Sequence, residues 1–134
     1  MLENAGFAVQ AMQTVPDEEG QISAAIVHAC DILQADLVIT TGGTGLSPRD
    51  VTPEATLAVL DREIRAIPVA MWVEGLKITP RAMLTRSVCV IRKKSLILNL
   101  PGSPKAVSES LDAVLDTFPH ALDMLRGSSG DCAR

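Results

Sequence analysis

The residues best suited to chemistry form a glycine-rich loop that is followed by a carboxylate. The loop is Thr40-Thr41-Gly42-Gly43-Thr44-Gly45; it follows the apolar run Leu37-Val38-Ile39, and Asp50 comes shortly after it. Three glycines in four positions allow positive φ angles and a close approach of a ligand to the main chain. Successive N–H groups in such a turn form a concavity that binds anions. We therefore expect phosphate as the ligand, with Asp50 placed to hold an accompanying cation.

Two familiar nucleotide loops do not fit this spacing. No Gly-Lys-Ser or Gly-Lys-Thr follows, so the loop is not a Walker A motif, and Pro48 stands where a dinucleotide fingerprint would need its third glycine. A tight turn without a ligand is the alternative, with Asp50 only capping a helix that starts near Thr52. Ligands of open α/β sheets gather beyond the carboxyl ends of the strands, and the position of this loop favours binding.

A second carboxylate and a second loop occupy similar positions along the chain. Asp17 follows a predicted strand that ends at Thr14. One or two carboxylates together with phosphate oxygens suit Mg²⁺, although Asp17 taken by itself is interpreted as a turn residue. Pro101-Gly102-Ser103 links a predicted strand to a predicted helix, and a helix N-terminus favours anions. Its alternative is an ordinary turn between a strand and a helix.

The order of the predicted elements indicates one α/β domain over residues 1–134. Apolar residues recur with helical spacing from Ile22 to Leu33, and the pairs Thr52-Pro53 and Ser103-Pro104 predict helix starts. Alternating strands and helices predict a three-layer sandwich with a mostly parallel, Rossmann-like sheet. The predicted strands are residues 7–14, 37–40, 87–91 and 96–100, and the predicted helices are residues 22–33, 52–64, 104–115 and 118–125, with Gly6 and Gly127 as stop signals.

Composition excludes several classes of partner. A net charge of −4 with a pI near 5.1 predicts no nucleic-acid surface, since the only basic cluster is Arg92-Lys93-Lys94. No apolar run approaches the length of about 20 residues that a membrane-spanning helix needs, so we expect no membrane partner. The cysteines Cys30, Cys89 and Cys132 match no zinc or disulfide pattern, which favours a reduced, cytoplasmic protein.

Two long strings of residues resemble a known family. The first runs from Thr40 through Gly45 and on through Arg49-Asp50-Val51-Thr52-Pro53-Glu54. The second joins Leu76-Lys77-Ile78-Thr79-Pro80, Ala82-Met83-Leu84-Thr85-Arg86 and Asn99-Leu100-Pro101-Gly102-Ser103-Pro104. Both resemble the molybdopterin adenylyltransferase branch of the molybdenum-cofactor biosynthesis family, which includes the bacterial Mog proteins and the G domain of gephyrin.

The resemblance implies an enzyme that transfers an adenylyl group from ATP to molybdopterin with Mg²⁺ and releases pyrophosphate. It implies Asp17 and Asp50 as catalytic, metal-binding carboxylates, and Thr85 at a position that is usually serine in the family. It also implies a homotrimer and the molybdate-insertion enzyme as a candidate partner, and the apolar character of residues 67–73 predicts a contact surface there. The implied substrate-binding residues are Thr41, Gly42, Gly43, Thr44, Gly45, Thr85, Pro101, Gly102 and Ser103.

The chain departs from the family pattern at its start. Family members begin with a strand and a Ser-Asp loop that have no counterpart before Glu3. We therefore expect this chain to be an N-terminally truncated form, either a fragment or the product of a late start. Two other functions stay open: a molybdopterin-binding domain of the molybdate-insertion type, and a non-catalytic trimeric scaffold module.

Overall fold

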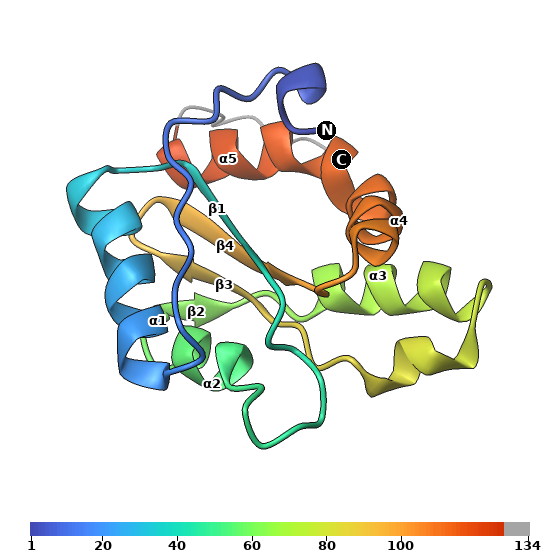
Figure 1. The fold of residues 1–134 in the computed structure, drawn as a ribbon. Helices are drawn as coiled ribbons and strands as arrows, with labels where there is room; N and C mark the ends of the chain where they lie inside the picture. Colours follow the sequence, from blue (N-terminus) through green and yellow to red (C-terminus); the bar gives the residue numbers. More distant parts are fainter. Residues whose placement is uncertain (128–134) are drawn as a thin grey trace.

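Within residues 1–127, four strands form a mixed sheet between two layers of helices (Figure 1). A computed structural model describes residues 1–127 of the chain. In that part of the chain, no helix has the length and apolar character needed to cross a membrane. The elements in chain order are η1 (Glu3–Ala5), α1 (Glu19–Val27), η2 (His28–Ile32), β1 (Leu37–Thr41), α2 (Thr52–Leu57), β2 (Arg62–Glu63), α3 (Ala66–Leu76), η3 (Pro80–Leu84), β3 (Cys89–Arg92), β4 (Ser95–Leu100), α4 (Pro104–Val114), η4 (Leu115–Thr117) and α5 (Phe118–Arg126).

The sheet has the order β1-β4-β3-β2. β1 pairs with β4 in parallel, from Leu37 opposite Leu96 to Thr41 opposite Leu100, whereas β3 is antiparallel to both β4 and β2. The predicted α/β class is confirmed, but the prediction of a mostly parallel sheet is wrong. Only Lys93 and Lys94 separate β3 from β4, with Lys93 at a φ of 55°, and so short a turn can join only antiparallel strands.

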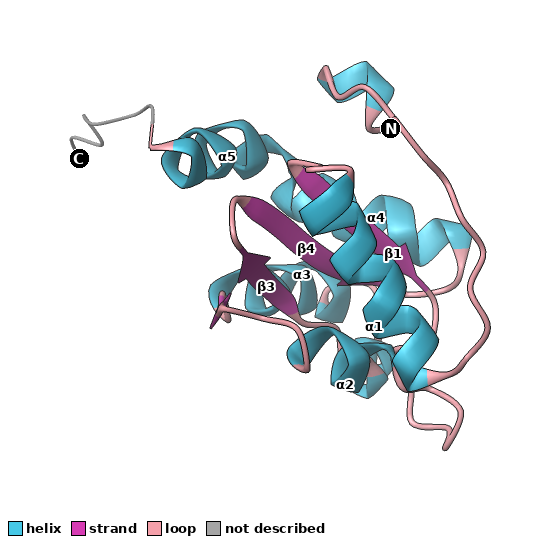
Figure 2. Cartoon of the chain, turned by 90° about the vertical axis from the view of Figure 1, so that its left-hand side faces the viewer, coloured by secondary structure: helices cyan, strands magenta, loops and turns pink. Residues whose placement is uncertain are grey.

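The central strand β4 separates two apolar clusters because its side chains alternate between the faces of the sheet. Leu96, Leu98 and Leu100 face a cluster formed with α3, α4 and α5. Ile97 faces the opposite cluster, formed with α1 and α2. Helices therefore cover both faces, which confirms the three-layer sandwich (Figure 2).

The predicted strand at residues 7–14 is wrong. This segment runs as extended coil from η1 to the start of α1, because none of its main-chain groups pairs with a strand of the sheet (Figure 2). Phe7 and Val15, near its two ends, pack against opposite core clusters. Gly6 ends η1 with a φ of 92°, as the sequence predicts.

The predicted helix at residues 52–64 is also wrong in its second half. α2 ends at Leu57, which is 40% exposed, while the residues that follow join the sheet. The main-chain N–H groups of Asp61 and Ile64 donate to the carbonyls of Ile91 and Cys89 on β3. These hydrogen bonds to the sheet take the place of those that a longer α2 would form. The predicted helix at residues 22–33 likewise divides into α1 and the π-helical turn η2.

Other local signals are confirmed. The Ser103 hydroxyl accepts a hydrogen bond from the Ala106 N–H at 3.1 Å and caps α4, which begins at Pro104. α5 ends at Gly127, whose φ of 71° suits a residue without a side chain. Both signals act within one turn of helix, which is why sequence alone reveals them.

A buried amide connects β4 to its neighbours. Asn99 is completely buried, and its Nδ2 donates to the hydroxyl oxygens of Thr40 on β1 and Thr56 on α2, both at 3.0 Å. Its Oδ1 accepts from the Val88 N–H at 3.3 Å, and the Thr56 hydroxyl donates in turn to the Thr52 carbonyl. This network joins β1, after which the glycine loop begins, to α2, before which the loop ends.

We expect Asn99→Ala to lower the free energy of unfolding by about 1–3 kcal/mol, because it leaves buried polar groups without partners. Urea denaturation measures the loss. Thr56→Val keeps the shape of its side chain and tests the same network, so the double variant should lose less than the sum of the two single losses. Additive losses would show that the two residues act independently.

Candidate functional site

The glycine loop and the second loop meet beyond the carboxyl ends of β1 and β4. The Gly42 N–H donates to the Leu100 carbonyl at 3.0 Å, which continues the parallel ladder into the loops. A Cβ added to Gly102 would lie only 3.5 Å from the Cα of Gly42. Thr41, Gly42, Pro101 and Gly102 are therefore neighbours in space.

The loop requires glycine at its centre. Gly43 has a φ of 71°, and a Cβ there would lie 2.2 Å from the Thr52 hydroxyl oxygen. The Gly43 carbonyl accepts from the Thr52 N–H at 3.1 Å, which closes the loop at the start of α2. The N–H groups of Gly43, Thr44 and Gly45 have no acceptor within residues 1–127, so the hydrogen bonds of the loop itself use none of the three.

Asp50 folds back over this loop. Its Oδ2 accepts from the Ser47 N–H at 3.0 Å, and a Cβ on Gly45 would lie 2.8 Å from the same oxygen. The carboxylate makes no capping bond to α2, which begins at Thr52 with Val51 as its N-cap residue and has no side-chain cap. The helix-cap alternative for Asp50 is therefore wrong, because the carboxylate closes a turn within the loop instead.

Thr85 lies against the buried side of the glycine loop. Its hydroxyl donates to the Thr44 hydroxyl oxygen at 3.2 Å and lies 3.3 Å from the Ser87 hydroxyl. Thr44 is buried, and its carbonyl accepts from the Arg86 N–H at 2.8 Å. The segment before β3 thus reaches the loop through both side-chain and main-chain contacts.

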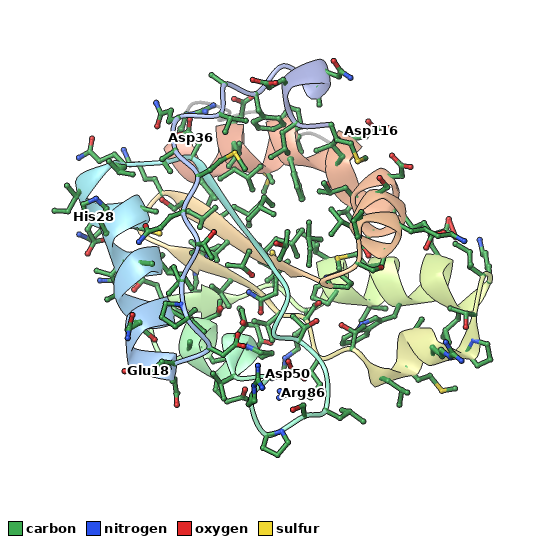
Figure 3. All side chains as sticks on the ribbon, in the orientation of Figure 1. Glu18, His28, Asp36, Asp50, Arg86 and Asp116 are labelled. Carbon is green, nitrogen blue, oxygen red and sulfur yellow. The ribbon has the colours of Figure 1, made fainter. Side chains whose placement is uncertain are left out.

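The guanidinium of Arg86 donates hydrogen bonds to the same loop and to α2 (Figure 3). Its Nε donates to the Gly45 carbonyl at 2.8 Å, its Nη2 to the Asp50 carbonyl at 2.6 Å, and its Nη1 to the Glu54 carboxylate at 2.6 Å. The hydrogen bond from this guanidinium lowers the pKa of the Glu54 carboxyl below its ordinary value. Figure 3 shows Asp50 and Arg86 side by side at this end of the molecule.

Two of the predicted site residues, Asp17 and Ser103, make their contacts outside the glycine loop. Asp17 lies 3.9 Å from the guanidinium of Arg49, the neighbour of Asp50, in a loose ion pair of exposed side chains. This pair brings both predicted carboxylates to one end of the sheet, with Asp17 facing a cation of the protein. The hydroxyl of Ser103 caps α4, as described above.

Within residues 1–127, no group of three or more histidine, cysteine or acidic side chains could hold a metal ion.

A pocket of about 180 Å³ opens beside the loops, between α3, η3 and α4. Thr85 and Pro101 line it together with Trp72, whose buried Nε1 has no hydrogen-bond partner among the described residues. A wider surface groove of about 350 Å³ lies between α3 and α4, and none of the predicted site residues lines it. The smaller pocket is therefore the one connected to the site.

The two described cysteines are packing residues. Cys30 and Cys89 are buried and free, whereas Cys132 lies outside the described residues. Burial raises the pKa of Cys89 to about 12, and it also raises the pKa of Cys30. Because the thiolate is the nucleophilic form, neither side chain is reactive at neutral pH.

Sequence reasoning missed the roles of Arg86, Glu54 and Asn99. Arg86 and Glu54 stand inside the motif strings, but their partners are 32 to 41 residues away along the chain. Asn99 interrupts an apolar strand, and this polar residue at a buried position was the available signal.

The fold and this pair of loops define an α/β domain with two adjoining loops beyond the carboxyl ends of its parallel strands. The family model described as "Probable molybdopterin binding domain" matches residues 1–120, and the chain belongs to this family. The resemblance drawn from the two motif strings is thereby confirmed.

Named relatives agree with that assignment. The chain is 49% identical over 125 residues to molybdopterin adenylyltransferase of Escherichia coli K12, covering 84% of this chain and 64% of the relative. It is 43% identical over 116 residues to molybdopterin adenylyltransferase of Helicobacter pylori J99, covering 87% and 66%. The chain thus spans slightly less than two thirds of these relatives.

A solved structure shares the fold. The crystal structure of the molybdopterin biosynthesis enzyme MoaB from Thermus thermophilus matches with a TM-score of 0.85 and 50% sequence identity. The match covers 90% of this chain and 76% of that one.

We expect Glu54→Gln to lower the free energy of unfolding at pH 7 by up to about 1 kcal/mol, since the ion pair is partly exposed. The lowered pKa of Glu54 makes its contribution fully present above the ordinary carboxyl pKa of 4.5. That contribution is lost as the pH falls through the lower, folded-state pKa. Urea denaturation between pH 7 and pH 3 should therefore show the two proteins converging in acid.

The exposed Glu3 of η1 supplies the control variant Glu3→Gln. A difference between wild type and Glu54→Gln that stays constant from pH 7 to pH 3 would contradict the assigned ion pair.

Proposed function

We propose that this chain carries the adenylyl-transfer site of molybdenum-cofactor biosynthesis, with ATP and molybdopterin as substrates and adenylyl-molybdopterin and pyrophosphate as products. One observation carries the proposal: the glycine loop and the Pro101-Gly102-Ser103 loop adjoin at the ends of two parallel strands. Family membership and the names of the curated relatives support the same reaction.

The loop is suited to a phosphate chain. The N–H groups of Gly43, Thr44 and Gly45, with no acceptor among residues 1–127, would donate to phosphate oxygens of ATP. Donors fixed before the reaction stabilise charge without reorganising as it develops. The pocket lined by Thr85 and Pro101 adjoins these donors and would receive part of the second substrate.

The chemical step needs positioning more than covalent participation by the protein. An oxygen of the terminal phosphate of molybdopterin attacks the α-phosphorus of ATP, forming a new P–O bond. The bond between the α-phosphorus and the bridging oxygen breaks, and pyrophosphate leaves with that electron pair. A phosphate oxygen is already an adequate nucleophile, so two substrates held in line gain most of the acceleration from orientation.

Asp50 fits a site for Mg²⁺ of the usual kind, in which one or two carboxylates act together with phosphate oxygens. Its Oδ2 is held by the Ser47 N–H beside the free donors of the loop, and Asp17 lies at the same end of the sheet. Asp50, with Asp17 in support, would hold the ion, which when bound neutralises charge on the departing pyrophosphate.

Two alternatives are separable by experiment. A molybdopterin-binding domain of the molybdate-insertion type and a non-catalytic scaffold would both bind without turnover. Incubation with ATP and molybdopterin distinguishes them from the transferase, because only the transferase forms adenylyl-molybdopterin. The expectation that the chain is an N-terminally truncated form stays a prediction, as does the molybdate-insertion enzyme as a partner.

We also propose a cytoplasmic homotrimer formed through α3 and η3. Of the apolar residues 67–73, Met71 is buried in the core, whereas Val69 and Val73 are about half exposed. Leu76 at the end of α3 is also about half exposed, and η3 adds the exposed side chains of Met83 and Leu84. Exposed apolar patches of this kind usually mark an association surface. The free, buried cysteines Cys30 and Cys89 suit the reducing cytoplasm.

The adenylyltransferase proposal predicts that Asp50→Asn lowers ATP-dependent turnover by roughly 10²-fold or more, the loss typical of one key electrostatic contact. Asparagine keeps the shape of the side chain but removes the charge that would hold Mg²⁺. Molybdopterin affinity should change much less, because Asp50 does not line the pocket proposed for part of the second substrate. The measurements are adenylyl-molybdopterin formation and pterin binding at saturating Mg²⁺.

Asp61→Asn is a matched control. The carboxylate of Asp61 likewise accepts a main-chain N–H in a turn, from Lys93 at 2.7 Å, but this exposed residue lies at the far end of the sheet. Its substitution should leave turnover unchanged. Turnover near the wild-type level in Asp50→Asn would remove the physical support for a metal at this position.

The trimer proposal predicts that Val73→Glu produces monomers in sedimentation experiments, since a charge in the centre of an apolar contact is costly. Ile32→Glu, at an exposed apolar residue on η2, should leave a trimer intact. Wild-type protein that sediments as a monomer at micromolar concentration would overturn the proposal.

A further inference from the structure

The guanidinium of Arg86 joins three parts of the chain that surround the proposed nucleotide loop. Its Nε and Nη2 donate to main-chain carbonyls at both ends of the segment 45–50, those of Gly45 and Asp50. Its Nη1 donates to Glu54 on α2 at 2.6 Å, and Nη2 lies 3.4 Å from the other oxygen of the same carboxylate. The segment that carries Asp50 is therefore spanned by one side chain.

The partners of this guanidinium argue against a direct contact with substrate. Each of its three nitrogen atoms already donates to a group of the protein, in the planar, forked arrangement that arginine alone provides. Glu54 balances its charge and fixes its orientation. An arginine that bound phosphate would instead direct its fork toward the ligand.

We propose that Arg86, oriented by Glu54, is a positioning residue that fixes the glycine loop and aims the Asp50 carboxylate. Arg86 acts through the main chain of the loop and does not touch the reacting groups. Its effect on turnover rests on the proposed adenylyl transfer, whereas its effect on loop rigidity does not.

Arg92 offers a matched control within the same chain. It too forms a forked ion pair, to Asp31 at 2.9 and 3.1 Å, and donates to a main-chain carbonyl, that of Val59, at 2.9 Å. This cluster lies at the turn between β3 and β4, and these hydrogen bonds involve no residue of the glycine loop. Arg92→Lys therefore removes a similar set of hydrogen bonds at a position away from the site.

Amide hydrogen exchange on the full chain without ligand tests the rigidity of the loop. The informative N–H groups are those of Ser47, Asp50 and Thr52, each bonded within the loop. Arg86→Lys should raise their exchange rates about tenfold, the factor that 1.4 kcal/mol represents, while β4 amides change little. Arg92→Lys should leave these three rates unchanged. Equal rates in wild type and Arg86→Lys would overturn the proposal.

Glu54→Gln is the second variant, for use if Arg86→Lys does not fold. It keeps the guanidinium but removes the charge that orients it. A smaller rise in the same three amides supports the proposal, and unchanged rates contradict it.

A double-variant cycle tests the link to Asp50. In the Arg86→Lys protein, Asp50→Asn should cost markedly less turnover than in wild type, because the carboxylate is no longer aimed. Equal costs in both backgrounds would show that Arg86 contributes only stability. If the wild-type chain neither bound ATP nor formed product, the proposed function would fail, while the exchange rates would still decide whether Arg86 fixes the loop.

Discussion

The parallel pairing of β1 with β4 is the constraint on which the site depends. Because the two strands run in the same direction with Thr41 opposite Leu100, their carboxyl ends coincide and their following loops start side by side. The hydrogen bond from Gly42 to Leu100 extends this register by one residue. The site therefore requires the other predicted site residues to lie only at this one end of the sheet.

Polar contacts fix the conformation of the glycine loop at this end of the sheet. Asn99 joins β1, β4 and α2 from inside, and Arg86 joins the glycine loop to α2 from outside. Between them, the loop leaves three N–H groups with no acceptor among residues 1–127. A loop held on two sides can present free donors without collapsing onto them, which is the requirement for preorganised binding of an anion. The apolar helices on both faces supply the rigidity behind it.

The sequence predicted the features that depend on neighbouring residues. Glycine spacing located the loop, and Ser103-Pro104 located the start of α4, because both signals act within a few residues. The strand predicted at residues 7–14 failed because strand formation requires a partner, and the end of α2 was missed because residues 61–64 pair with β3. The parallel character of the sheet was overestimated although the turn at Lys93-Lys94 indicated a hairpin. Arg86 could not be assigned a role, since its three partners lie far from it in sequence.

The most direct test of this account is to map where ATP binds on the backbone. Titration of isotopically labelled protein with ATP and Mg²⁺, followed by amide chemical shifts, reports each N–H separately. We predict the largest changes at Gly43, Thr44 and Gly45, with Gly102 of the adjoining loop also affected. Changes confined to the groove lined by Glu74, Lys77 and Asp112, with the glycine loop unaffected, would contradict it.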